Sequence, residues 1–198
     1  MWSSEVTNMI ITGIWETLYM TLVSTLVGYV IGLPMGIILT VSDKDGIKPN
    51  AVLYKILDVI ANIVRSVPFI ILLVLLIPFT RLVVGKSYGS TATIVPLVIA
   101  AAPYIARMVE SSLKEVDAGV IEAARSMGAS NFTIITKVML VEARTSLLVG
   151  ATITLGTILG YSAMSGAVGG GGLGAIAIRY GYTCLLYTSP SPRDGATS

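Results

Sequence analysis

Four long apolar segments constrain the fold more than any other feature of this sequence. A membrane-spanning helix needs roughly 20 mostly apolar residues, and fewer where it packs against protein. Because lipid supplies no hydrogen-bond partners, the backbone of such a segment must satisfy its own polar groups, which favours helices over isolated strands. The sequence therefore predicts an all-α integral membrane protein, with a transmembrane domain at 1–182 and spans at about 9–41, 56–79, 91–106 and 146–164.

The composition also indicates lipid surroundings rather than a soluble core. Hydrophobic residues make up 54% of the chain, charged residues only 12%, and the mean hydropathy is +0.84. A soluble domain typically carries about 25% charged residues, because it needs a polar surface. The net charge of +2 is small and the basic residues are scattered, so we expect no nucleic-acid partner. The first apolar run follows no Lys or Arg and is too long for a secretory signal.

Several kinds of chemistry are excluded by the residue types. The chain has no histidine, the usual general base and the commonest metal ligand. Its single cysteine, Cys184, excludes an internal disulfide framework and a Cys-rich zinc site. The glycines from Gly166 to Gly174 lack the following lysine of a phosphate-binding loop, and indicate irregular backbone at the outer mouth instead. We therefore expect no catalytic residue, cofactor or metal in this chain.

The positive charges predict an orientation. If the loop at 42–55 is cytoplasmic, the segment at 107–145 is cytoplasmic too. The basic residues outside are then Arg81, Lys86 and Arg179, and those inside are Lys44, Lys48, Lys55, Arg107, Lys114, Arg125, Lys137 and Arg144. Cytoplasmic loops carry an excess of Lys and Arg. We therefore expect the amino terminus to lie outside.

Three glycines in the first span, Gly28, Gly32 and Gly36, recur at four-residue spacing. Small residues at this spacing let a second helix approach closely. Glycine is also common in membrane helices in general. The spacing therefore allows either a helix–helix interface or no particular role.

The predicted cytoplasmic segment, at about 109–145, contains helical periodicity. Its apolar residues are Val109, Leu113, Val116, Val120, Ile121, Ala124 and Met127, and the opposite side carries Glu110, Lys114, Glu115, Glu122 and Arg125. Asp117 can cap a short helix, Gly128 suits the left-handed position after it, and Ser130 can cap the next helix. Taken alone, the pattern describes a surface helix that covers the ends of the bundle.

The stretch Glu122-Ala123-Ala124-Arg125-Ser126-Met127-Gly128, followed after nine residues by Val138-Met139-Leu140, resembles the EAA signature of ABC-importer permeases. The resemblance implies a type I permease fold. It also implies that Glu122, Ala123, Ala124 and Gly128 lie in a cytoplasmic coupling helix that follows Asp117 and docks in a cleft of the ATP-binding subunit. The family usually has proline where this chain has Val141 and Thr145.

Further stretches, at 62–69, 102–110 and 160–164, are similar to permeases of methionine importers, and the similarity covers about 14–182. It implies a homodimer of five-helix subunits in the bacterial inner membrane. Two ATP-binding subunits and a substrate-binding lipoprotein would serve that dimer. The resemblance also implies import of a small amino acid, methionine in particular. Because this chain has no Walker motif, we expect ATP hydrolysis in the partner subunit.

The sequence also contains four candidate residues of the transport pathway, and each has a second, structural interpretation. Arg65 lies about ten residues into the second span, where a charge is costly and faces protein or a watery cavity. It is either a pathway or gate residue, or a structural polar contact between helices. Tyr161, Ser162 and Met164 precede the glycine run and either line the pathway or pack in the core. A thioether such as Met164 would suit a methionine substrate.

Other functions remain open at this point. The chain could be a permease for another polar amino acid or small solute, a gradient-driven secondary carrier, or a non-transporting scaffold. A carrier needs internal repeats and intramembrane acidic groups. Here the Asp and Glu residues lie in loops or near the ends of spans, which disfavours a carrier.

The last segment, 183–198, is polar and too short to span a bilayer. Its ending, 189–198, resembles translated vector sequence joined to a truncated gene. The family resemblance implies a fifth helix that such a chain would lack. We therefore expect this chain to assemble poorly with its ATP-binding partner.

Overall fold

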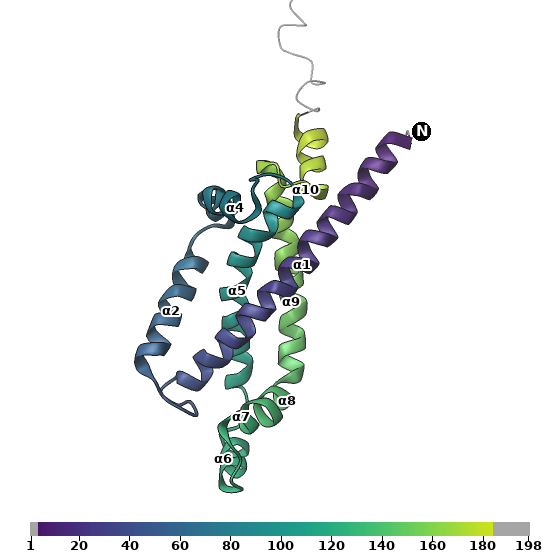
Figure 1. The fold of residues 1–198 in the computed structure, drawn as a ribbon. Helices are drawn as coiled ribbons and strands as arrows, with labels where there is room; N and C mark the ends of the chain where they lie inside the picture. The colour runs from purple at the N-terminus through teal and green to yellow at the C-terminus, as the bar shows by residue number, and fades with distance from the viewer. Residues whose placement is uncertain (1–3, 184–198) are drawn as a thin grey trace, which may run out of the picture.

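The computed structural model describes residues 4–183, and every regular element in that range is a helix (Figure 1). The long helices are α1 (Ser4–Ser42), α5 (Ser90–Lys114) and α9 (Arg144–Ser165). The shorter elements are α2 (Ala51–Ser66), α3 (Phe69–Leu75), α4 (Ile77–Val84), α6 (Ala118–Ser126), α7 (Asn131–Thr133), the π-helix η1 (Ile134–Met139), α8 (Leu140–Glu142), the 3-10 helix η2 (Gly166–Val168), α10 (Gly172–Ile176) and the π-helix η3 (Ala177–Thr183). From residue 184 onward, the tail expected from the sequence lies outside the described residues.

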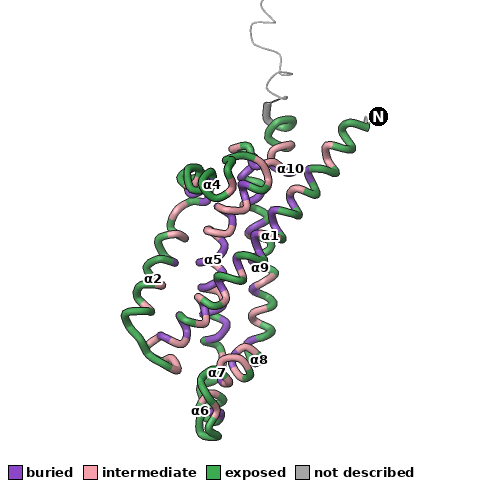
Figure 2. The backbone as a smooth tube through the Cα atoms, viewed as in Figure 1, coloured by how far each residue is buried: buried purple, intermediate pink, exposed green. Residues whose placement is uncertain are grey.

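Three of these helices, α1, α5 and α9, are long and apolar enough to cross a membrane. They contain the first, third and fourth spans expected from the sequence. Within the most apolar part of each helix, 56% of α5 is buried, against 33% of α1 and 22% of α9. Figure 2 shows this burial along α5 and the facing side of α1. α5 is therefore the central helix of the bundle, and its buried side chains include Leu97 and Ile105.

The glycines of α1 lie where α1 crosses α5. A Cβ atom on Gly32 would come within 2.6 Å of the Ala102 carbonyl oxygen, and one on Gly36 within 2.5 Å of the Ala106 carbonyl oxygen. Real Cβ atoms do not approach backbone so closely, so glycine is required at both positions. The four-residue spacing therefore marks a helix–helix interface, which the sequence had left open.

The expected second span, 56–79, is not a single helix. α2 ends at Ser66, and the chain bends by 102° before α3 starts at Phe69. Pro68 has no backbone N–H, and it disfavours helical geometry at the residue before it. Val67 accordingly adopts an extended conformation, with φ −84° and ψ 124°. The break leaves α2 as a separate helix beside α5 and α1, with most of its surface exposed (Figure 2).

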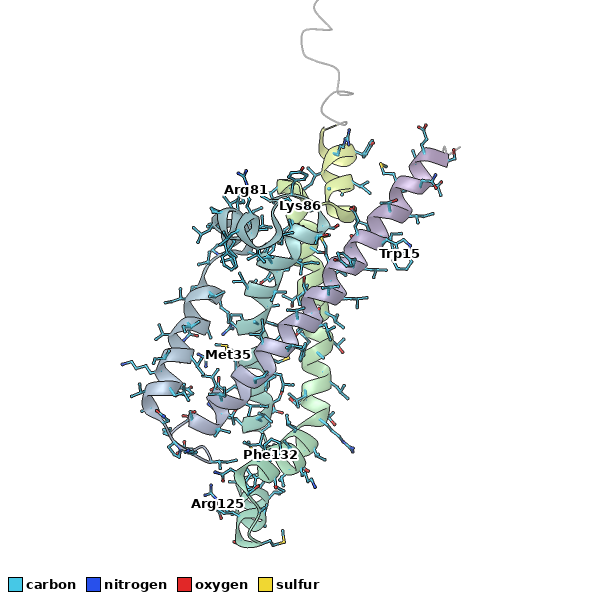
Figure 3. All side chains as sticks on the ribbon, in the orientation of Figure 1. Trp15, Met35, Arg81, Lys86, Arg125 and Phe132 are labelled. Carbon is cyan, nitrogen blue, oxygen red and sulfur yellow. The ribbon has the colours of Figure 1, made fainter. Side chains whose placement is uncertain are left out.

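The two ends of the bundle differ in what they carry. Figure 3 shows Arg81 and Lys86 at one end, and Arg125 and Phe132 at the other. We call these the α10 end and the α6 end, after the short helix found at each (Figure 1). The predicted orientation places the first group outside and the second in the cytoplasm, so the structure separates them as that orientation requires.

At the α10 end, the glycine run forms the irregular backbone predicted from the sequence. Gly169, Gly171 and Gly172 have positive φ angles of 83°, 82° and 71°, which L side chains rarely adopt. The Gly172 N–H donates to the Glu16 carboxylate at 2.6 Å, and the Leu173 N–H donates to the Thr17 hydroxyl at 2.9 Å. These bonds fix the start of α10 against α1.

Candidate functional site

Local chemistry sets both ends of α6. The Asp117 carboxylate accepts a hydrogen bond from the Gly119 N–H at 2.7 Å, which caps the amino end. At the other end Gly128 has φ +80°, and its N–H donates to the Arg125 carbonyl at 3.0 Å. Ser130 caps the following helix by accepting from the Thr133 N–H. All three end signals predicted from the sequence are confirmed.

The inner face of α6 is anchored to the rest of the protein. Ala124 is buried, and Ile121 packs against the hydrophobic core. The Arg125 guanidinium donates to the Ile47 carbonyl oxygen at 3.1 Å. This bond ties α6 to the loop that connects α1 with α2, because Ile47 lies within that loop.

The outer face of α6 is exposed and carries small and apolar side chains. Glu122 and Ala123 are exposed, Met127 is 81% exposed, and the nearby Phe132 is 75% exposed. Met127 does not lie on the buried apolar side that helical periodicity suggests. The regular helix stops at Ser126, and Met127 occupies the turn that leads into Gly128. Met127 and Phe132 thus leave apolar surface at this end of α6 that is available to another protein.

The predicted coupling residues therefore have different structural positions. Asp117 and Gly128 shape the ends of α6, and Ala124 packs inward. Glu122 and Ala123 have exposed side chains that a partner can reach, and Asp117 is exposed as well while its carboxylate caps α6. Glu122 also lines a cavity of about 420 Å³ between α6, the end of α5 and the α1–α2 loop.

A cluster of charged side chains supports this end of the bundle, and the sequence reasoning did not find it. Its centre is Glu110, which was expected on the polar surface but has a side chain only 5% exposed. Glu110 accepts from Arg107 Nη1 at 2.7 Å, from Lys114 Nζ at 2.8 Å and from the Tyr54 hydroxyl at 3.2 Å. α5 can extend past residue 106 because its charged side chains there are paired with one another and with Asp58.

The cluster joins three parts of the chain. Arg107 also pairs with Asp58 on α2, and Lys114 Nζ lies 2.6 Å from Asp43 Oδ2 in the α1–α2 loop. The hydrogen bond from Lys114 holds the pKa of Asp43 below its ordinary value, against a smaller opposing effect of burial. We call the set Asp43, Tyr54, Asp58, Arg107, Glu110 and Lys114 the Glu110 cluster. A visible signal was the spacing of its polar residues, three or four apart on both α2 and α5.

Arg65 does not join this cluster or any other in the described residues. It lies in the last turn of α2 with an exposed side chain, and no hydrogen bond or ion pair of that side chain occurs within 4–183. Asp58, seven residues earlier, pairs with Arg107 instead. The structural polar contact considered for Arg65 is therefore not formed among residues 4–183.

The other pathway candidates are not brought together. Tyr161 is half-buried and stacks on Phe69, with ring centroids 4.5 Å apart and planes at 6°. Ser162 is buried, and its hydroxyl donates to the Leu159 carbonyl within α9. Met164 is 51% exposed. Tyr161 and Ser162 thus make packing contacts, and Met164 alone of the three presents most of its surface outward.

Comparison with known proteins places this fold in a family. Residues 28–183 match the family described as binding-protein-dependent transport system inner membrane component. A probable D-methionine transport system permease protein MetI of Vibrio cholerae is 49% identical over 181 residues, which cover 91% of this chain and 80% of that protein. The D-methionine transport system permease protein MetI of Escherichia coli K12 is 56% identical over 158 residues, 80% of this chain and 73% of that protein.

The chain is also similar to solved structures of ABC transporters. A chain from inward-facing conformations of the MetNI methionine ABC transporter has a TM-score of 0.91 and 51% identity, over 98% of this chain and 88% of that chain. A chain from an amino acid ABC transporter has a TM-score of 0.73 at 23% identity, which shows a common fold only.

The three apolar helices, the bent α2–α3 pair and the projecting α6 define a permease of the bacterial inner membrane with the type I ABC-importer fold. The chain belongs to the family of binding-protein-dependent transport system inner membrane components. The resemblance seen in the sequence is confirmed, and the chain is a transport component.

Proposed function

We propose that this chain is the transmembrane subunit of an ATP-driven importer that moves methionine into the cytoplasm. The observation that carries the proposal is its 49% and 56% identity to proteins named D-methionine permeases, over most of the chain. In this proposal two copies of the chain form the pathway. Two ATP-binding subunits and a substrate-binding lipoprotein complete the transporter, and the ATP-binding subunits perform all ATP hydrolysis.

α6 is the coupling helix of this proposed transporter. Its support is physical: Glu122 and Ala123 are exposed on a helix that is capped at both ends and anchored on its inner face, and Met127 is exposed in the turn that follows. A rigid helix with a small-residue outer face fits a cleft on a partner better than a flexible loop would. Closure of the ATP-binding subunits would then move α6 and alternate the access of the pathway.

The proposal also includes residues of the transport pathway. Arg65 and Met164 have exposed side chains that a second permease subunit or a pathway could contact. Tyr161 and Ser162 would act by shaping the wall, because their own polar or aromatic groups are engaged.

Uptake by proteoliposomes tests the function. Because the 198-residue chain is expected to assemble poorly, a full-length form of the permease is reconstituted with the ATP-binding subunit and the binding protein, and entry of radiolabelled methionine is measured with and without ATP. We expect uptake that needs both ATP and the ATP-binding subunit, and that unlabelled methionine suppresses more than other amino acids do. Gradient-driven uptake without the ATP-binding subunit would overturn the proposal and favour a secondary carrier.

A further inference from the structure

α2 is attached to the bundle mainly by polar groups. Of its 16 residues only Ala61 is buried, and much of its apolar surface faces away from the rest of the chain. Its inward side chains include Tyr54, Asp58 and Asn62, at four-residue spacing on one face. All three bond to side chains of α5: Tyr54 to Glu110, and the other two to Arg107.

α2 also lies between two places where the chain can pivot. Before it comes the irregular loop at 43–50, and after it comes the 102° bend at Val67 and Pro68. A helix between two such joints can move as a rigid body, with the joints absorbing the change in backbone angles. The Glu110 cluster therefore supplies most of the polar contacts that hold α2 against α5.

The same cluster continues toward α6. Lys114 is the last residue of α5, and it bonds both Glu110 and Asp43. Asp43 begins the loop whose Ile47 carbonyl accepts a hydrogen bond from Arg125 of α6. An unbroken series of contacts thus runs from α6 through the loop and the end of α5 to α2.

We propose that Glu110 is a positioning residue that makes α2 follow the movement of α6 during transport. The proposal rests on the proposed function, because it needs α6 to be moved by an ATP-binding subunit. Glu110 suits the role because it is buried and bonds both cations and the Tyr54 hydroxyl at once. Charge-assisted hydrogen bonds of this kind are short and directional, and they are poorly screened when buried.

Glu110→Gln tests this role, because it removes the charge and keeps the shape. The matched control is Glu115→Gln, the same change at an exposed residue of the same region that has no ion pair in the described chain. Three quantities are measured on the same proteoliposomes: methionine uptake, ATP hydrolysis and the amount of ATP-binding subunit that stays bound to the permease. For Glu110→Gln we expect uptake per ATP hydrolysed to fall by about tenfold or more, a typical size for coupling between sites. We expect binding of the ATP-binding subunit to be unchanged, and Glu115→Gln to behave as the wild type.

A distance measurement separates coupling from a general structural role. A spin label at Val52→Cys, which is 70% exposed on α2, is introduced with Cys184→Ser so that each permease carries one label. In the wild-type background we expect ATP to shift the label-to-label distance across the dimer, and in Glu110→Gln we expect that shift to be lost while hydrolysis continues. An equal ATP-dependent shift in both would overturn the proposal.

Lys114 offers a second test if Glu110→Gln fails to fold. Its side chain is 43% exposed, so its replacement disturbs the interior less. We expect Lys114→Met to uncouple hydrolysis from uptake and Lys114→Arg to restore the coupling. Full coupling in Lys114→Met would overturn the proposal. Absence of ATP-dependent uptake in the wild type would overturn both the proposed function and the role of Glu110. Normal coupling in every variant would overturn only the role of Glu110.

Discussion

The α6 end and the α10 end of the bundle are held together by different chemistry. At the α6 end charged side chains bond to one another, as in the contacts of Lys114 with Asp43 and Glu110, in addition to the contact of Arg125 with the Ile47 carbonyl. At the α10 end the bonds reach backbone: Glu16 accepts from the Gly172 N–H, and the Gly89 N–H donates to the Gly169 carbonyl at 2.9 Å. Side-chain pairs can exchange by rotamer changes, whereas backbone contacts fix the path of the chain. The difference supports the proposal that shape changes during transport start at the α6 end.

The largest expected effect is at the outer face of α6. Glu122→Lys reverses the charge on the proposed docking face, so we expect loss of the ATP-binding subunit and of uptake, with membrane insertion unaffected. Co-purification and proteoliposome uptake measure both. Glu115→Lys is the control, because it makes the same reversal at an exposed site away from that face. Unchanged association in Glu122→Lys would show that the docking face lies elsewhere.

Next in size is the removal of a cation from the Glu110 cluster. Arg107→Ala leaves Asp58 without its cation and Glu110 with one cation fewer. Breaking a buried ion pair costs about 3–5 kcal/mol, so we expect a clear fall in the melting temperature of the detergent-solubilised protein. Arg65→Ala removes the same side chain from an unpaired, exposed site of α2 and should change the melting temperature little. Equal shifts in the two variants would argue against the cluster as a stabilising unit.

A smaller effect is expected at the α10 end. Glu16→Ala deletes the acceptor of the Gly172 N–H, and a hydrogen bond to a charged group contributes about 1.5–3 kcal/mol. We expect faster amide hydrogen exchange in α10 and unchanged exchange in α6. Glu5→Ala, at an exposed position near the start of α1, is the control. Faster exchange at both ends would mean that the two ends are not independent.

The smallest expected effect is a loss of stability at acidic pH. Lys114 lowers the pKa of Asp43 in the folded protein, so this pair stabilises the fold above the ordinary carboxyl pKa and loses that contribution as the pH falls through the lowered value. We expect wild type to lose its advantage over Asp43→Asn at acidic pH, in melting curves recorded from pH 7 downward. A constant difference between the two proteins across that range would contradict the pairing.

Local signals in the sequence were enough to predict α6 and its ends. Asp117, Gly128 and Ser130 act on backbone groups within a few residues, so their roles do not depend on the rest of the fold. The close approach of α1 and α5 was predictable to a lesser degree. The spacing of Gly28 and Gly32 suggested an interface, but could not say which helix would fill it.

Contacts between distant segments could not be predicted in the same way. Glu110 lies on the polar side of a helical pattern, and only the path of α2 brings Tyr54 and Asp58 against it. That path depends on the bend at Pro68, which is compatible with either a kinked span or a complete break. Nor does periodicity show that Met127 leaves the helix and enters solvent.

The two adjacent alanines of the signature have opposite orientations, and this has a genetic consequence. Ala123 faces solvent, and Ala124 is buried against the permease itself. Bulky alleles at Ala123 should therefore be suppressed by second-site mutations in the gene for the ATP-binding subunit. Bulky alleles at Ala124 should be suppressed only by mutations within the permease gene. A selection for restored growth would thus show that mutations in two neighbouring codons have suppressors in two different genes.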